Sequence, residues 1–565
     1  MNLYDWVQIF FYLVVLLLIL FPLGMYMQYV IEEREIPFFR FFSSLERKIY
    51  ILTGTDPKRE MSAGEYMGSV LGFNLVCFII LYLILVLQGY LGLNPGNFRG
   101  LSWDLAFNTA VSFTTNTNWQ AYSGESTLSS FSQMAGLGVQ NFTSAATGMA
   151  VFFALTRALS RTNSSVIGNF WFDLIRSILY ILLPLSIIIS TFLILQGTVQ
   201  SFSNPVEAVT LEGGRQMIPL GPAASQIAIK QLGTNGGGFF GVNSAHPFEN
   251  PTPFSNFIQS ISILILPASM IWTYGLMLNF RKHALVILSV VFSFFLVSLA
   301  VSLYFEYLPN PLFGLGSGLN MEGKEVRFGT ASSVIWSSVT TLASNGSVNA
   351  MHDSFQPLSG GAALFNILLG EVIFGGVGSG MYGIVLFIVL TVFIAGLMVG
   401  RTPEYLGKKI EAMEITYASA GILIPGAVLL AFSGLSSVVQ AGLSSVSNSG
   451  PHGLSEILYA FASAANNNGS AFAGLNVNTP YYNILLGLSM IAGRYGVIIP
   501  ALALAGSMAA KKKISQSSGT FPTDGVLFGI LLSFVIFVIG ALTFFPALLL
   551  GPVGEHLLLN QGRVF

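Results

Sequence analysis

Charge is scarce in this 565-residue sequence: Asp, Glu, Lys and Arg make up 9% of it, whereas hydrophobic residues make up 53%. Because a soluble protein carries about a quarter charged residues, this composition excludes an ordinary soluble domain. The net charge of −1 gives no support for a nucleic-acid partner. The single cysteine, Cys77, excludes an internal disulfide framework. The mean hydropathy of +0.70 indicates a protein that lies in lipid.

Nucleotide-binding motifs are also missing. No Walker A sequence occurs. The stretch Gly236–Gly241 matches the spacing G-x-G-x-x-G, but it has neither a preceding strand nor an acidic residue about 20 positions later. We therefore expect no ATP hydrolysis by this chain alone and no organic cofactor.

Continuous apolar runs of about 20 residues predict α-helical membrane spans. A membrane-spanning β-barrel is excluded because its strands alternate residue by residue. Ten spans are expected, near residues 3–30, 67–91, 132–156, 174–198, 257–280, 284–306, 361–400, 418–440, 482–508 and 525–550. The segment 361–400 is too long for one straight helix and is interrupted by the Gly/Ser-rich stretch Gly375–Gly380. The fold class predicted is an all-α polytopic membrane protein.

Basic residues cluster in alternate connections between these spans. The clusters are Arg34, Arg40, Arg47, Lys48, Lys58 and Arg59; Arg157, Arg161 and Arg176; Arg281 and Lys282; Arg401, Lys408 and Lys409; and Lys511, Lys512 and Lys513. Because cytoplasmic loops are enriched in Lys and Arg, we expect these connections inside the cell and both termini outside. The first apolar run lacks the positive n-region of a signal peptide, which favours a retained helix.

Four short turns without any charged residue lie in the connections on the opposite side. They are Thr114–Asn118, Thr234–Gly238, Ser344–Ser347 and Asn466–Ser470. Each turn follows a helix-length apolar or Ser/Thr-rich stretch, at residues 103–113, 222–232, 331–342 and 454–464. This recurrence predicts four repeats, each consisting of a helix, a re-entrant pore segment and a second helix.

The four repeats use eight of the ten spans, and the first and last helices flank them. The predicted units are residues 1–66 for the N-terminal helix and its cytoplasmic loop, 67–160, 161–283, 284–410 and 411–513 for the repeats, and 514–565 for the C-terminal helix.

The composition of the turns indicates a monovalent cation. A short helix that enters the membrane from outside points the negative end of its dipole at mid-membrane, and Gly and Asn tolerate the sharp bends that expose backbone carbonyls. Rings of carbonyls can replace the hydration shell of an ion. Divalent ions usually demand carboxylates, and the turns contain none. The alternative is that the turns are ordinary extracellular loops rich in turn-forming residues.

Five stretches of the sequence resemble the KdpA family, the potassium-binding A subunits of Kdp-type potassium-transporting P-type ATPases. They are Thr115–Gln120, Gly233–Phe240, Asn243–Pro251, Met351–Ser354 and Asn466–Phe472. The order of the motifs and the number of spans fit over essentially the whole chain. The resemblance implies the fold of the potassium-transporter superfamily, with four pore loops around a selectivity filter for K⁺. The filter residues implied are Thr115, Asn116, Thr117, Thr234, Asn235, Gly236, Ser344, Asn345, Gly346, Asn467, Asn468 and Gly469.

The same resemblance implies partners and a location. Members of the family work in the bacterial inner membrane as part of the Kdp complex. There a B subunit of the P-type ATPase class hydrolyses ATP, and a C subunit and a small F subunit complete the assembly. This sequence lacks the Asp-Lys-Thr-Gly phosphorylation motif of P-type ATPases, which fits a non-catalytic subunit.

Two charged residues, Glu371 and Arg494, fall within predicted spans, and intramembrane charges usually face the protein interior or a transport pathway. We expect Arg494 to form a positive barrier beneath the filter and Glu371 to line the route out. The alternative is an ion pair that holds two helices together. Gly376, Gly378 and Gly380 belong to a break that, in the resembled family, forms a gate below the filter. The spacing of Gly376 and Gly380 would also suit close helix packing.

The function predicted is therefore K⁺ selection and translocation in an ATP-driven uptake complex. A stand-alone K⁺ or Na⁺ transporter driven by membrane potential remains the alternative. A secondary transporter of organic solutes is disfavoured because the sequence lacks inverted halves.

Overall fold

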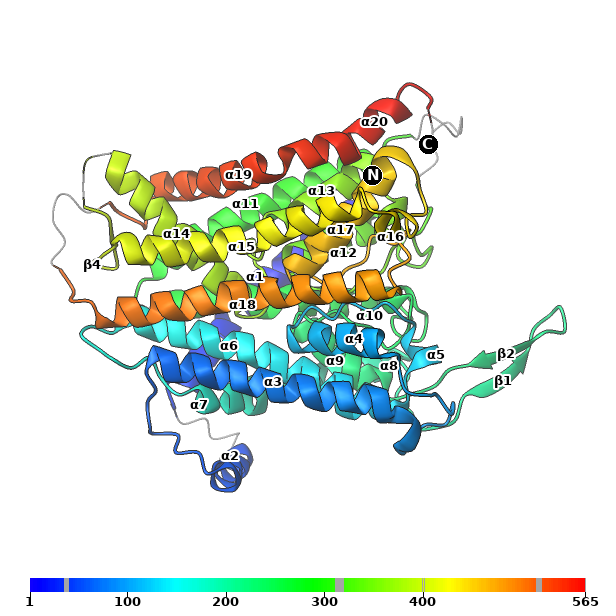
Figure 1. Ribbon diagram of the computed structural model, residues 1–565, viewed down its shortest axis with the longest axis horizontal. Helices are drawn as coiled ribbons and strands as arrows, with labels where there is room; N and C mark the ends of the chain where they lie inside the picture. Colours follow the sequence, from blue (N-terminus) through cyan, green and yellow to red (C-terminus); the bar gives the residue numbers. More distant parts are fainter. Residues whose placement is uncertain (35–39, 310–319, 399, 401, 515–520, 564–565) are drawn as a thin grey trace.

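Long helices that run side by side dominate the computed structural model of the chain (Figure 1). The structure describes residues 1–34, 40–309, 320–398, 400, 402–514 and 521–563. For Arg40 and Phe41 it describes the backbone only. Arg401 and residue 399 of the predicted span 361–400 lie outside the described residues.

Ten helices in the described part of the chain are long and apolar enough to cross a membrane. Six are single helices: α1 (Leu3–Ile31), α10 (Pro253–Met277), α11 (Arg281–Glu306), α14 (Ser379–Met398), α15 (Ala412–Ser436) and α18 (Pro480–Ala510). The other four include a 3₁₀ or π-helical turn: α3 (Ala63–Leu87) continues to Tyr90 as a 3₁₀ turn, α6 (Val139–Ser160) follows π-helical Ser132–Gly138, α7 (Phe170–Arg176) joins α8 (Leu183–Leu195) through π-helical Ser177–Leu182, and α19 (Val526–Leu548) continues through π-helical Leu549–Val553 into α20 (Gly554–Leu559). Each predicted span overlaps one of these helices, which confirms the all-α polytopic fold class.

Burial separates an inner from an outer set of helices. In the span that contains α6 and in α10, the most apolar window of 18 residues is 83% buried. The corresponding windows of α1 and of the span that contains α3 are 28% and 22% buried. Because lipid tails are as apolar as a protein core, a helix on the rim can leave large side chains such as Phe10 and Ile80 exposed. The inner helices α6 and α10 instead carry polar side chains toward the centre of the protein, including Asn141 and Ser144.

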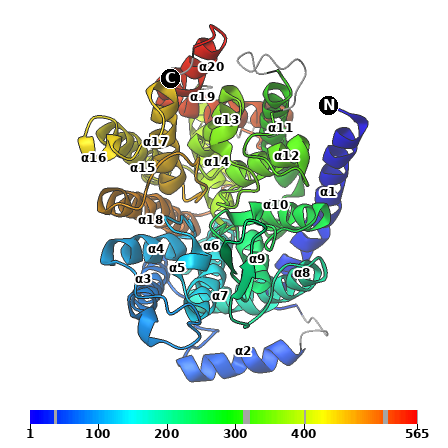
Figure 2. The same ribbon diagram turned by 90° about the vertical axis from the view of Figure 1, so that its right-hand side faces the viewer.

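Four shorter helices penetrate the bundle where the pore segments were predicted. They are α4 (Trp103–Thr114), α9 (Ala223–Leu232), α12 (Gly329–Leu342) and α17 (Gly450–Ala465). Nearly all of their residues are buried. When the bundle is viewed from the end that carries both termini, these helices are distributed around its centre (Figure 2).

The predicted span 361–400 is broken, as its Gly/Ser-rich stretch indicated, but the break begins earlier than expected. Helix α13 (Pro357–Leu368) ends before Leu369, and α14 starts at Ser379. The ten residues between them follow an irregular path with positive φ at Phe374 and at three glycines. Gly380 is therefore already helical, and a Cβ atom there would lie 1.6 Å from the carbonyl oxygen of Phe374.

Several small elements escaped the sequence analysis because each is short or amphipathic. Helix α2 (Arg40–Thr53) lies at the edge of the bundle in Figure 1, where its Glu46 pairs with Arg176 at 2.9 Å. The hairpin of β1 (Val206–Val209) and β2 (Arg215–Ile218) projects from the opposite end, and β3 (Glu404–Tyr405) pairs with β4 (Lys408–Lys409). Two further short helices are α5 (Gly124–Thr127) and α16 (Gln440–Leu443).

Both termini lie at one end of the bundle, and the predicted basic connections meet at the other (Figure 1). Lys408 has a buried ammonium group that donates hydrogen bonds to the carbonyl oxygens of Ala158 (3.1 Å), Met508 (2.8 Å) and Arg161. These oxygens belong to the last turns of α6 and α18 and the residue that follows α6. A cation at helix C-terminal ends is stabilised by the helix dipoles, so Lys408 ties two repeats together at this end.

At the end that carries the termini, His452 at the start of α17 connects two other segments. Its Nε2 lies 2.8 Å from Asp353 Oδ1, and its Nδ1 lies 2.9 Å from Glu555 Oε1 in α20. Burial alone would lower the pKa of His452, but the hydrogen bonds to Asp353 and Glu555 and the charges of the two carboxylates outweigh it and raise the pKa to about 10. His452 is thus a charged link between the last pore helix and the C-terminal helix.

This link makes stability depend on pH. Because the pKa of His452 is raised from its ordinary value of 6.5 to about 10, its stabilisation is complete below pH 6.5 and is lost as the pH rises through 10. Over this pH range we expect the free energy of unfolding of the wild-type protein to fall by on the order of 1–2 kcal/mol more than that of His452→Gln, after allowance for solvent screening. Thermal unfolding of both proteins between pH 6 and 10 measures the difference, and parallel pH curves would contradict the assignment.

Candidate functional site

All four pore helices end in the same backbone conformation. The residue after each helix cap has positive φ, and the next amide donates to the carbonyl five residues back, as in a Schellman motif. The positive-φ residues are Asn116 (65°), Thr234 (49°), Ser344 (47°) and Asn467 (47°). The amide bonds run from Thr117 to Ser112 (2.9 Å), from Asn235 to Lys230 (2.9 Å), from Asn345 to Thr340 (3.0 Å) and from Asn468 to Ser463 (2.8 Å). The four predicted turns are thus equivalent in structure as well as in sequence position.

Hydrogen bonds between neighbouring turns close them into a ring. Asn116 Nδ2 donates to the carbonyl oxygens of Gly233 (3.1 Å) and Thr234 (3.2 Å), which joins the first turn to the second. The other joints are Asn345 Nδ2 to the Lys230 carbonyl (3.2 Å), Asn468 Nδ2 to the Thr340 carbonyl (2.9 Å) and Asn467 Nδ2 to Thr117 Oγ1 (2.9 Å). The last of these bonds makes direct neighbours of residues that are 350 positions apart in the sequence.

Glycines allow this close approach. A Cβ atom on Gly236 would lie 2.0 Å from the amide nitrogen of Gly346, and one on Gly469 would lie 1.7 Å from the carbonyl oxygen of Thr117. Gly236 and Gly469 also have positive φ, at 90° and 92°. A side chain at either position would push two turns apart, so the ring requires glycine there.

Each turn of the ring contains main-chain oxygens that accept no hydrogen bond from the described residues. Within the described residues, no hydrogen bond reaches the carbonyl oxygens of Thr117, Asn235, Gly346 or Gly469, one residue from each turn, and all four residues are buried. A buried polar group without a partner is costly. Since the turns contain no charged side chain, the arrangement suits a cation that carbonyl oxygens can coordinate.

The irregular segment between α13 and α14 packs directly against this ring. The amide of Val377 donates to Thr234 Oγ1 (2.8 Å), and the amide of Gly375 donates to the carbonyl oxygen of Leu342 at the end of α12 (2.9 Å). Gly376 lies beside the same threonine, since a Cβ atom there would be 3.2 Å from Thr234 Oγ1. Gly378 has a φ of 84° and abuts the backbone of α6 at Gly148.

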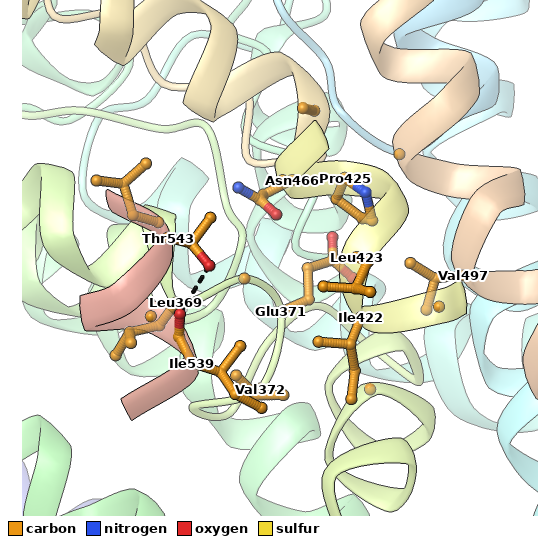
Figure 3. Close-up of a pocket in the computed structure, with 18 of the residues that line it drawn as sticks. Leu369, Glu371, Val372, Ile422, Leu423, Pro425, Asn466, Val497, Ile539 and Thr543 are labelled. Carbon is orange, nitrogen blue, oxygen red and sulfur yellow. Dashed lines mark hydrogen bonds between the residues drawn. The ribbon is translucent and has the colours of Figure 1, made fainter. Parts of the chain in front are cut away.

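A cavity of about 250 Å³ adjoins the ring, and both predicted intramembrane charges line it. Figure 3 shows Glu371 among the lining residues. Glu371, Arg494, Asn466 and Asn467 contribute to its lining, with residues of α15 and α19 on the far side. Arg494 is 3% exposed, and its Nη2 donates to the carbonyl oxygen of Ser144 (3.3 Å). In the described residues, no ion pair within 4.0 Å joins it to Glu371, so the alternative of a direct ion pair between two helices is wrong.

The structure brings the predicted filter residues together in the ring and places Glu371, Gly376, Gly378 and Arg494 in or beside the segment and cavity that adjoin it. Gly380 lies in the first turn of α14 and packs against the same segment, since a Cβ atom there would lie 1.6 Å from the carbonyl oxygen of Phe374.

A polar network behind the second turn was missed by the sequence analysis. It includes Lys230, Gln231, Asn243, Ser244 and Glu249. One signal in the sequence could have revealed it: Lys230 is a lysine inside an otherwise uncharged pore segment.

The chain is similar in sequence to known proteins over nearly its whole length. The sequence model of the KdpA family, described as the potassium-transporting ATPase A subunit, matches residues 10–557. The chain is 56% identical to the "Potassium-transporting ATPase potassium-binding subunit" of Leptospira interrogans (serovar copenhageni), over 99% of this chain and 100% of that protein. It is 50% identical to the protein of the same name from Pseudomonas syringae pv. tomato, again over 99% and 100%.

Among solved structures, the potassium transporter TrkH from Vibrio parahaemolyticus is similar at 14% sequence identity with a TM-score of 0.47, over 74% of this chain and 83% of that chain. The family model spans nearly all of the sequence, and half or more of the residues are identical to those of full-length relatives. The chain therefore belongs to the KdpA family of potassium-transporting ATPase A subunits.

Proposed function

We propose that this chain binds K⁺ in the ring of four turns and translocates it as one component of a potassium-transporting ATPase. The observation that carries the proposal is the closed ring, in which each turn has at least one buried carbonyl oxygen that accepts no hydrogen bond from the described residues. The names of the relatives, which are potassium-binding subunits of such an ATPase, support the identity of the ion.

Physical chemistry favours a monovalent ion at this site. The idealised cost of moving an ion into a low-dielectric interior is of order 20 kcal/mol, and a ring of carbonyl dipoles offsets it by replacing the hydration shell. The C-terminal ends of α4, α9, α12 and α17 meet at the ring, so their dipoles add negative potential without an ionised side chain. The filter proposed consists of Thr115, Asn116, Thr117, Thr234, Asn235, Gly236, Ser344, Asn345, Gly346, Asn467, Asn468 and Gly469.

We propose that the route beyond the filter runs past the irregular segment and through the cavity of Glu371 and Arg494. The segment is hydrogen-bonded to the second turn and to α12, so a change in its path would alter the exit from the ring. Gly376, Gly378 and Gly380 supply the backbone freedom and the close packing of this gate. Arg494 supplies a positive barrier, and Glu371 attracts the ion out of the filter.

The chain itself is non-catalytic in this proposal. ATP hydrolysis is assigned to the B subunit, a P-type ATPase, and the C subunit and the small F subunit complete the Kdp complex. The location proposed is the bacterial inner membrane, with both termini extracytoplasmic. The basic connections at the end of the bundle opposite the termini support this orientation.

The first test of the proposal is Gly469→Ala. Its Cβ atom would collide with the Thr117 carbonyl, and its φ of 92° is unfavourable for alanine. We expect the apparent K⁺ affinity of ATP-dependent uptake by the reconstituted complex to fall by at least about tenfold. Gly434→Ala is the matched control, because a Cβ atom on this helical glycine of α15 would meet no atom within 4 Å. Uptake that needs no ATP, or unchanged affinity in Gly469→Ala, would contradict the proposal.

The second test concerns the two charges in the cavity. Arg494→Met removes positive charge from the exit route, so we expect K⁺ to bind about tenfold more tightly while less K⁺ is transported per ATP. Glu371→Gln should instead lower the maximal uptake rate with little change in apparent affinity. Both variants are compared with Lys512→Met, which removes an exposed positive charge far from the ring. If both variants transport K⁺ with the wild-type affinity, the wild-type rate and the wild-type number of K⁺ ions per ATP, the proposed exit route past Glu371 and Arg494 is wrong.

A further inference from the structure

A lysine with no role in the function proposed above lies within the second pore helix. Lys230 and Glu249 are both 0% exposed, and the Lys230 ammonium donates to the Glu249 carboxylate. It also donates to Asn243 Oδ1 at 2.8 Å. Glu249 Oε1 accepts a further hydrogen bond from Ser244 Oγ (2.9 Å). Charges this deeply buried are tolerated only when they are paired and hydrogen-bonded.

Asn243 connects this ion pair to the ring. Its Nδ2 donates to the carbonyl oxygen of Gly236 in the second turn (2.8 Å), while its Oδ1 accepts from Lys230 and from the amide of Ser244 (2.8 Å). The Lys230 ammonium and the Ser244 amide both donate to Asn243 Oδ1, so the oxygen end of the Asn243 side chain must face Lys230. The nitrogen end must then face Gly236, so the lysine determines the orientation of the donor on that carbonyl.

The repeats provide an internal comparison for Lys230. The residue that accepts the closing amide bond of the turn is Ser112, Thr340 or Ser463 in the other three repeats. Each of these hydroxyl groups contacts its own turn or the residue just beyond it. Ser112 Oγ donates to the Trp119 carbonyl (2.9 Å), Thr340 Oγ1 donates to the Ser347 carbonyl (2.7 Å), and Ser463 Oγ accepts from the Gly469 amide (2.9 Å). In the second repeat a long charged side chain occupies the equivalent position and reaches the turn through Asn243.

The same helix position also joins the second turn to the third. The Lys230 carbonyl accepts from the amides of Asn235 and Gly236 and from Asn345 Nδ2. Its neighbour Gln231 accepts from Ser347 Oγ (2.9 Å) and donates to Ser244 Oγ (3.2 Å). The backbone and side chains of residues 230 and 231 therefore support one half of the ring from behind.

We propose that Lys230, neutralised by Glu249, is a positioning residue that orients the Gly236 peptide through Asn243 and thereby sets the ion selectivity of the second turn. This inference rests on the proposed function, in which the ring binds K⁺. Lys230 does not touch the ion. It fixes a backbone dipole, and Glu249 cancels the positive charge that would otherwise repel a cation in the ring.

Two substitutions separate these two effects. Asn243→Asp keeps the shape and the contact to Lys230 but replaces the donor to Gly236 by an acceptor, which repels the carbonyl oxygen. We expect the preference for K⁺ over Na⁺ in cation-stimulated ATPase activity of the purified complex to fall by about tenfold. Glu249→Gln leaves the ammonium uncompensated, so the apparent affinities for K⁺ and Rb⁺ should fall together by about tenfold with a smaller change in their ratio.

Asn169→Asp is the matched control. The Asn169 side chain is also buried and hydrogen-bonded to backbone carbonyls, those of Asp56 (3.0 Å) and Arg59 (2.9 Å), but it caps α7 and makes no contact with the ring. We expect it to lower the melting temperature of the complex and to leave the K⁺ to Na⁺ ratio unchanged.

The outcomes distinguish this inference from the function on which it rests. If the wild-type complex shows no K⁺-selective ATPase activity, the proposed function fails. If the wild-type complex is selective and Asn243→Asp keeps its K⁺ to Na⁺ ratio, or changes only its melting temperature as Asn169→Asp does, the positioning role of Lys230 is overturned.

Discussion

Buried main-chain oxygens without a protein donor are the constraint on which this structure depends. A carbonyl group inside a membrane protein needs a partner, and within the described residues each turn has at least one such oxygen without a donor, among them those of Thr117, Asn235, Gly346 and Gly469. Three other features of the ring fix the positions of these oxygens. Four helix caps bend the chain, asparagine side chains join neighbouring turns, and glycines at positions 236 and 469 let the backbones touch.

The four repeats are not identical, and two of them, the second and the third, differ from the others close to the ring. Among the repeats as the structure describes them, the third has a second helix that is broken, between α13 and α14, and this break contacts the second turn. In the second repeat the side chain behind the closing bond of the turn belongs to the buried ion pair of Lys230 and Glu249, whereas the other three repeats have a serine or a threonine at that helix position. A symmetric ring would hold an ion equally well from every side. In the function proposed, the break provides the exit from the ring, and the ion pair makes the second turn depend on charge.

The sequence predicted the elements of this fold but not the contacts between them. Apolar runs located the spans, and uncharged Asn/Gly turns located the ends of α4, α9, α12 and α17, because both signals are local. The contact of Asn116 with Gly233 and that of Asn467 with Thr117 are not local, so no spacing rule could reveal them. The start of the break at Leu369 was placed too late because its first residues, Leu369 to Phe374, include four that are apolar and give no signal of irregular backbone.

The central claim is that neutral carbonyl oxygens of four turns hold a dehydrated alkali ion. Anomalous diffraction from crystals of the complex grown in Rb⁺ tests it most directly, because it locates the ion without any assumption about transport. We expect an Rb⁺ peak enclosed by Thr117, Asn235, Gly346 and Gly469. A peak coordinated by Glu371 or another carboxylate, with none inside the ring, would contradict it.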